Sequence, residues 1–403
     1  MGYKDEDVEI EITLVNPNKV DTVAYLSFHS SYLLPTNEVL LKTGQHDSIS
    51  IPLDKFVVNE SCKSIKGIRI GSDLPILVYG SSRSTIRSST DFFLSIPQKA
   101  LGKVYSVITG LNRAQLLVVG LHSNTSVNIT VQSRYNASYQ NTIYQSGQTI
   151  EETLNEYETL LVENAGKYPF TDFSGTRIRS SAQVSVFSGN GFSGSSIQVE
   201  QLPTVALWGT YHIALPPDEN TIYNMTIVAV CNDTHISIEC SNHPEMTYTL
   251  QTGNFLRFPP SAAVCFILTS EPVEIAIEID GGGMDATMTI LQPMRRIHLG
   301  YFVFHLPAFR IDMQYTLVVT AYCNTSLRLD DATLPLFKVA TTDGHSSVCT
   351  GIQAIDNGTH AISSSDSAAF FISGYLYGRE RHQTEAMPLV PYLDGVSVNH
   401  VNL

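Results

Sequence analysis

The feature that most constrains this chain is a pattern that recurs along its length. A strand-like run, a short Ser-containing turn and a second alternating run occur in four places, around Ile70, Ile178, Leu268 and Ile362. Alternation of apolar and polar residues is typical of half-buried β-strands. A pattern that returns about every 100 residues predicts a fold assembled from copies of one β unit.

Two further motifs recur with the first. One runs from a proline towards Gly and Tyr, as in "SIPQKALGKVYSV" and "QLPTVALWGTYHIAL", and its four copies begin at Pro97, Pro203, Pro293 and Pro388. The other is an alternating run, an Asn-containing turn and another alternating run, with Asn124, Asn232 and Asn324 in the turns. Short polar turns between alternating runs indicate hairpins, so we expect both motifs and the Ser-turn pattern to fold as hairpins.

Together the motifs predict an all-β fold of internally repeated antiparallel four-stranded units. We expect four repeats within a single region, at 1–108, 109–216, 217–307 and 308–403. Each repeat would hold two four-stranded halves the size of a propeller blade, so a β-propeller-like fold of about eight blades is favoured. Four tandem β-sandwiches are the alternative. The run "TIEETL" from Thr149 is read as either a short helix or a polar strand.

The composition argues against several classes of function. Only 15% of the residues are charged and the net charge is −14, and a negative surface does not attract nucleic acid or anionic membranes. No run of about 18 uncharged apolar residues occurs, so we expect no membrane span. The run "GNGFSG" from Gly189 resembles a dinucleotide-binding pattern, but a strand-like run follows where a helix would have to begin. We therefore expect no cofactor.

Several features indicate an extracellular, secreted glycoprotein. Asn-x-Ser/Thr triplets, the acceptors of N-glycosylation, are unusually dense. They lie at Asn59, Asn124, Asn128, Asn136, Asn224, Asn232, Asn324 and Asn357. The first residues, "MGYKDEDVEI", lack the apolar region of a signal peptide. We therefore expect the chain to be a piece of a longer secreted protein, with its signal upstream.

The six cysteines favour disulfide bonds. Cys323 with Cys349 is the preferred bridge, and closing such a loop is worth roughly 3 kcal/mol in the chain-entropy model. His235 and His243 could complete a zinc site with two neighbouring cysteines, but the strand-like "HISIEC" favours disulfides, and we expect no metal. The other four cysteines compete for partners or stay free, and the sequence leaves their pairing open: Cys62, Cys231, Cys240 and Cys265.

The middle of the chain resembles a known family. The run "GTRIRSSAQVSVFSGN" followed by "VEQLPTVALWGTYHIALP" is similar to the IgGFc-binding protein N-terminal domain family. Ala182 and Gln183 stand where that family usually has Lys-Pro. The resemblance extends over nearly the whole chain and implies a secreted glycoprotein of mucus or extracellular matrix, often with von Willebrand type D modules elsewhere. The matching residues are Gly175, Thr176, Ile178, Ser180, Val184, Val186, Phe187, Ser188, Gly189, Glu200, Gln201, Leu202, Pro203, Trp208, Gly209 and Thr210.

These observations favour a non-catalytic interaction or adhesion module that binds extracellular glycoproteins or glycans. Immunoglobulin Fc is not assumed to be the partner. One alternative is a carbohydrate-active propeller enzyme, whose acid pair would come from carboxylates near strand ends such as Glu163, Glu200 and Glu278. The other is a structural spacer of a mucin-like polymer, with Cys62 as the residue for an intermolecular disulfide.

Overall fold

The structure is a computed structural model, and it confirms the all-β prediction. Its helical elements among the described residues are one turn, α1 (Leu53–Phe56), and two 3-10 helices, η1 (Gln98–Ala100) and η2 (Val205–Leu207). The run from Thr149 is a strand, so the polar-strand reading is the right one. The described residues are 8–31, 38–58, 61–84, 90–111, 113–165, 171–193, 196–218, 220–241, 243–261, 263–280, 286–297, 300–306, 314–340, 347–365, 370–380 and 383–388.

We call the four predicted repeats units 1 to 4; their boundaries stay a prediction. Each unit contributes one sheet, named sheet I, that contains its first strand. In unit 1 this sheet is β4 (His46–Ser50), β1 (Val8–Val15), β7 (Leu77–Ser84) and β8 (Thr90–Leu94). In unit 2 it is β13 (Thr142–Tyr144), β12 (Ala137–Tyr139), β15 (Glu158–Asn164), β10 (Ala114–Gly120), β16 (Arg177–Ser193) and β17 (Ser196–Gln201). In unit 3 it is β22 (Phe255–Ser261), β19 (Tyr223–Ala229), β23 (Cys265–Asp280) and β24 (Ala286–Leu291). In unit 4 it is β30 (Phe337–Ala340), β31 (Val348–Ile355), β27 (Gln314–Tyr322), β33 (Phe370–Glu380) and β34 (Gln383–Pro388). A short strand from the end of unit 3, β25 (Arg295–Ile297), also pairs with β33.

A second sheet, named sheet II, contains the second strand of each unit. In units 2, 3 and 4 it has four strands, and the fourth comes from the preceding unit's Pro–Gly–Tyr motif. In unit 1 the order is β3 (Glu38–Leu41), β2 (Thr22–Phe28) and β6 (Ile68–Ser72), and in unit 2 it is β14 (Thr149–Leu154), β11 (Thr125–Thr130), β16 and β9 (Gly102–Ser106). In unit 3 the order is β21 (His243–Leu250), β20 (Thr234–Cys240), β23 and β18 (Gly209–Ala214). In unit 4 it is β29 (Ala332–Thr333), β28 (Leu327–Leu329), β32 (Gly358–Ser364) and β26 (Tyr301–Leu306).

The predicted hairpins are wrong in three respects. The Ser-turn pattern is one long strand in units 2 and 3, because β16 and β23 first pair in sheet II and then continue into sheet I. The strands on either side of the Asn-containing turn do not pair with each other, since β10 belongs to sheet I and β11 to sheet II. The strand after the Pro–Gly–Tyr motif joins the next unit and so stitches neighbouring units together.

The registers nevertheless agree from unit to unit. Opposite pairs in sheet II are Leu26 with Ile70, Ile129 with Ile178, Ile238 with Ile267, and Leu329 with Ile362. The equivalent residue in unit 3 is therefore Ile267, which is buried, and not Leu268, which is 54% exposed.

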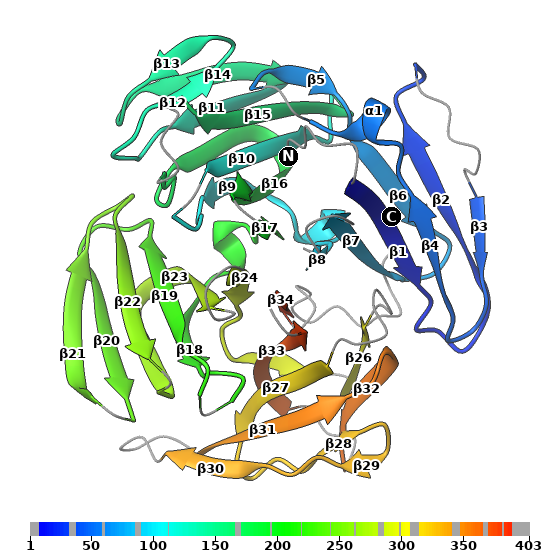
Figure 1. Cartoon of the computed structure of the whole chain (residues 1–403), viewed down its shortest axis with the longest axis vertical. Helices are drawn as coiled ribbons and strands as arrows, with labels where there is room; N and C mark the ends of the chain where they lie inside the picture. The colour runs from blue at the N-terminus through cyan, green and yellow to red at the C-terminus, as the bar shows by residue number, and fades with distance from the viewer. Residues whose placement is uncertain are drawn as a thin grey trace.

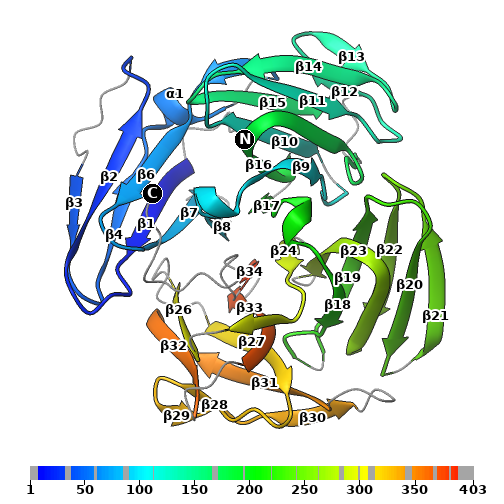
Figure 2. The same cartoon turned by 180° about the vertical axis from the view of Figure 1, so that it is seen from behind.

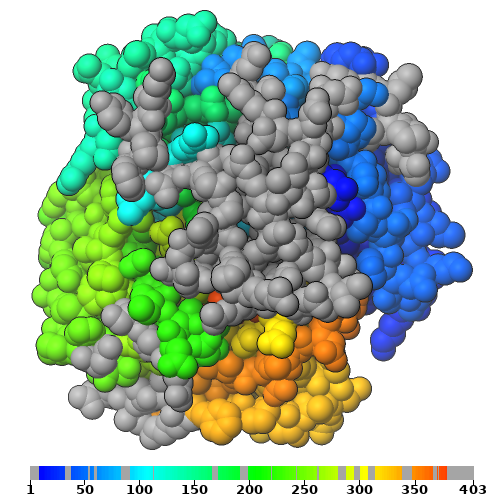
Figure 3. Space-filling model, in the orientation of Figure 1, coloured from blue at the N-terminus to red at the C-terminus, as the bar shows by residue number. Residues whose placement is uncertain are grey.

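The units lie around a common centre and share apolar cores with their neighbours. Val228 of unit 3 packs into the core of unit 2, and Tyr375 of unit 4 packs into the core of unit 3. Tyr79 of unit 1 packs into the core of unit 4, and β5 (Lys63–Ile65) pairs with β15, so the circle closes. The strands β8, β17, β24 and β34, one from each unit, meet at the centre (Figures 1 and 2), and the colours follow one another around the surface (Figure 3). The number of propeller blades stays a prediction, because long strands join the two sheets of a unit.

Candidate functional site

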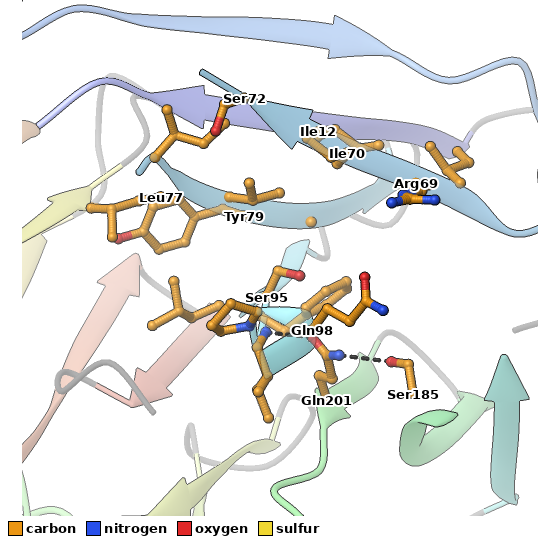
Figure 4. A pocket seen from close by; sticks show the side chains of 18 of the residues that line it. Ile12, Arg69, Ile70, Ser72, Leu77, Tyr79, Ser95, Gln98, Ser185 and Gln201 are labelled. Carbon is orange, nitrogen blue, oxygen red and sulfur yellow. Dashed lines mark hydrogen bonds between the residues drawn. The ribbon is translucent and has the colours of Figure 1, made fainter. Parts of the chain in front are cut away.

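A cavity of about 1200 Å³ with mostly apolar walls lies between unit 1 and unit 2. Its walls are β1, β6 and β7 on one side, and η1 with parts of β16 and β17 on the other (Figure 4). Ligand pockets usually measure about 300–1,000 Å³. A space of this size can hold solvent, a ligand or further chain.

The apolar side chains that face this cavity occupy core positions of the repeat. Ile70, Ile76 and Val78 of unit 1 are only half-buried. The residues at the same register positions in unit 2 are completely buried: Ile178, Val184 and Val186. The cavity is therefore a place where the interior of one unit is left open.

Polar groups line the cavity sparsely and already have partners. The amide nitrogen of Gln201 donates to Ser185 Oγ (2.7 Å), and its oxygen accepts from the Ile96 amide (2.7 Å). Arg69 and Glu156 form an exposed ion pair with a distance of 3.2 Å between Nη1 and Oε1. Acidic side chains also border the cavity, among them Glu11 and Asp91, but most of its wall is apolar, which favours apolar atoms.

A second feature is a buried polar centre where the central strands meet. Asp91 in β8 accepts a hydrogen bond from the Val199 amide, and Glu200 lies next to that residue in β17. Burial raises the pKa of Glu200 well above its usual range, the Asp91 charge adds to the rise, and Thr289 with the Ile290 amide oppose it. A pair of carboxyl groups is what a glycosidase requires. Both side chains are buried, although Asp91 also borders the apolar cavity.

Glu274 of β23 lies in the same region. Burial raises the pKa of its carboxyl group well above the usual range, and neither oxygen has a hydrogen-bond partner among the described residues. It borders a small cavity of about 10 Å³, together with Trp208 and Gln292, which is about the space of one water molecule. The other two carboxylates of the catalytic alternative lie elsewhere, since Glu163 accepts from Gln115 (2.5 Å) and Glu278 lies 3.9 Å from Arg257. Sequence reasoning missed Asp91 and Glu274 because nothing local marks them.

The predicted glycan acceptors are accessible wherever the structure describes them. Asn59 lies outside the described residues. The exposed acceptors are Asn124, Asn128, Asn136, Asn224, Asn232, Asn324 and Asn357. Asn124, Asn232 and Asn324 occupy the turns between sheets I and II of their units, as the repeat predicts.

The structure contains two disulfide bonds, both within a unit. Cys323 is joined to Cys349, the preferred bridge, and Cys240 is joined to Cys265. The bond from Cys240 to Cys265 uses a cysteine that the zinc alternative would have needed. In the described part of the chain, no group of three or more His, Cys, Asp or Glu side chains is placed to hold a metal. Cys62 and Cys231 lie outside both bonds and are half-buried. The described helices include none that is long and apolar enough to cross a membrane.

Comparisons with known proteins give one strong match. The sequence profile of the IgGFc binding protein family matches residues 91–378. No curated protein matches the sequence. Solved structures that align with the chain include a mutant of the major pilin from Streptococcus pyogenes (8% identity, 93% of this chain and 92% of the pilin, TM-score 0.17). Another is an anti-sigma factor domain-containing protein from Clostridium clariflavum (10% identity, 71% of this chain and 90% of that one, TM-score 0.14). These TM-scores are too low to carry an argument.

Proposed function

The chain belongs to the IgGFc-binding protein family, and we propose that it is a non-catalytic extracellular module that binds glycoproteins of mucus or matrix. The family match over residues 91–378 carries this proposal, because the family consists of non-enzymatic binding modules. Two disulfide bonds agree with an extracellular location. The binding surface would be formed by the turns that the rigid sheets present, which is a common use of loops on β scaffolds.

The accessible acceptor asparagines support the same proposal. Seven of the eight triplets lie on exposed positions, spread over units 2, 3 and 4. Glycans at these positions would keep the outer surface soluble and would restrict a partner to the turns between them. We propose all eight asparagines, including Asn59, as glycosylation sites; peptide mapping after enzymatic deglycosylation tests each one.

The chain secreted from cultured cells and applied to arrays of glycans and extracellular glycoproteins tests the function. We expect saturable binding to a defined subset, unchanged in Glu200→Gln. Incubation with polysaccharides provides the opposite test, because a carbohydrate-active enzyme using the central carboxyl pair would release sugars and would lose that activity in Glu200→Gln. Absence of binding together with such turnover would contradict the proposal.

A further inference from the structure

The boundary between units 1 and 2 differs from the other boundaries of the circle. At each of the others, a side chain of one unit is buried in the core of its neighbour: Val228 between units 2 and 3, Tyr375 between units 3 and 4, and Tyr79 between units 4 and 1. Between units 1 and 2 lies the apolar cavity of about 1200 Å³ instead. One of the four boundaries therefore has room inside it.

Residues at matching positions show how the two kinds of boundary differ. Val119 in β10 and Val228 in β19 hold the same register position, and so do Phe187 in β16 and Ala276 in β23. Val228 and Ala276 are buried in the core of unit 2. Val119 and Phe187 are only half-buried, and they line the cavity. The repeat therefore places apolar side chains at this boundary as it does elsewhere, but here the described neighbour does not cover them.

The wall from unit 1 is apolar as well. Ile12 of β1, Ile70 of β6 and Val78 of β7 line the cavity, and all three are half-buried (Figure 4). Two walls from different units thus present apolar side chains to one space. A molecule that fits between them removes apolar surface from water on both sides, which is the main source of affinity in apolar pockets.

Direct contacts join units 1 and 2 around the cavity. The Gly67 amide donates to the Tyr157 carbonyl (2.9 Å), and the rings of Phe93 and Phe187 meet edge to face with their centroids 5.1 Å apart. All four residues line the cavity. The space is therefore part of a joined interface between two sheets, a place where ligand pockets commonly occur.

The charges on the wall indicate what kind of molecule fits. Glu11, Asp91 and Glu156 contribute carboxyl groups. Of the cationic side chains, Arg69 is paired with Glu156, and Lys66 donates to the Val57 carbonyl. A ligand carboxylate would thus meet like charges and engaged cations, and it would also lose its hydration. The wall therefore favours an uncharged ligand.

A few uncharged polar groups are also available to such a ligand. Ser95 and Gln98 line the wall that faces Ile70, and they offer a hydroxyl group and an amide group (Figure 4). Pockets for small molecules typically combine apolar walls with a small number of polar groups that fix the orientation of the ligand.

We propose that this cavity binds an uncharged lipophilic molecule of the class of long-chain alcohols and sterols. Its apolar body lies between Ile70 of unit 1 and Val119 of unit 2, and its hydroxyl end faces Ser95 and Gln98. This site is separate from the turns that the proposed function uses, so it goes beyond that function and does not depend on it.

A fluorescent reporter with a matched pair of competitors tests the chemistry of the ligand. The secreted chain is titrated at neutral pH with N-phenyl-1-naphthylamine, an uncharged apolar dye, and we expect saturable binding. 1-Dodecanol and dodecanoate, which have the same chain length but differ in charge, then compete with the dye. We expect dodecanol to displace it at a concentration lower by about tenfold or more.

Substitutions on both walls test the location of the site. Val119→Trp and Ile70→Trp place a large ring in the cavity from opposite sides, and each should weaken binding of the dye by about tenfold or more. Val104→Trp and Ile143→Trp are the matched controls, because both positions are exposed and lie outside the cavity; they should bind the dye as the unsubstituted chain does. Thermal melts followed by circular dichroism identify the variants that fold.

Three results would overturn the proposal. The first is no saturable uptake of the dye, which would mean that solvent or further chain fills the space. The second is uptake that stays unchanged in a folded Val119→Trp or Ile70→Trp variant, which would place the dye elsewhere. The third is displacement by dodecanoate at the same concentration as by dodecanol, which would contradict the preference for an uncharged ligand.

Discussion

Individual glycines mark places where two backbones approach each other. At Gly189, φ is +157° and an added Cβ would lie 1.7 Å from the carbonyl oxygen of Gln198 in β17. At Gly147, φ is +86° and nothing lies within 4 Å of such a Cβ. The pattern "GNGFSG" around Gly189 therefore has a packing reason. The sequence could show that a glycine stands there, but not that another strand passes it.

These two glycines give a matched prediction. We expect Gly189→Ala to lower the free energy of unfolding by about 3 kcal/mol or more, from steric overlap added to backbone strain. We expect Gly147→Ala to lower it by about 1 kcal/mol, from strain alone. Urea denaturation of both variants measures the difference, and equal losses would contradict the account.

Glu274 gives a prediction about pH. Its pKa is raised in the folded chain by burial, so the folded state holds a proton that the unfolded state releases above about pH 4.5. Stability from this group is complete below that pH and is lost as the pH rises towards the folded pKa. Glu274→Gln should therefore raise the melting temperature at pH 7 and change it much less at pH 4. The exposed Glu151→Gln is the control; a variant that melts below the unsubstituted chain at pH 7 would count against the account.

At the scale of elements, the sequence predicted the strands better than their partners. Alternation identified both arms of β16, and the Asn-containing turns lie where the motif placed them. The pairing was wrong because β16 passes from one sheet into the other without ending, and only contacts with β10 and β11 decide which sheet each arm joins. Such contacts are long-range, so local pattern cannot specify them.

The contact between β26 and unit 1 gives a prediction about acid. His305 in β26 is fully buried, its ring lies 4.5 Å from that of His46, and its Nδ1 lies 3.0 Å from Thr359 Oγ1. Burial, with smaller contributions from His46 and His360, lowers the pKa of His305 from 6.5 to about 3. Stability from the neutral ring is therefore complete above about pH 6.5 and is lost as the pH falls towards 3.

His305→Gln should thus show a smaller fall in melting temperature between pH 6.5 and pH 4 than the unsubstituted chain does. His122→Gln, at an exposed turn, should keep the original pH dependence. Thermal melts at matched ionic strength measure both, and an unchanged slope in His305→Gln would exclude this residue as the origin of the acid effect.

For the whole molecule, the repeat in the sequence predicted that the fold consists of repeated β units, but not how these units join into a circle. Four copies were visible in the spacing of their motifs, whereas strand exchange between units, shared cores and the contact of unit 1 with unit 4 are properties of the folded chain. The candidate site was invisible for the same reason, because the cavity lies beside sheet II of unit 1, which has three strands in the described part of the chain. The account therefore rests on the four units forming one body that presents its turns to a partner.

Differential scanning calorimetry of the secreted chain tests that claim most directly. Because every unit shares strands or cores with its neighbours, we expect one cooperative transition, and Tyr79→Ala, which removes a buried ring between units 1 and 4, should shift that whole transition to lower temperature by a loss of about 3–5 kcal/mol. Several separate transitions, with only one of them moved by Tyr79→Ala, would show independent tandem domains and contradict the account.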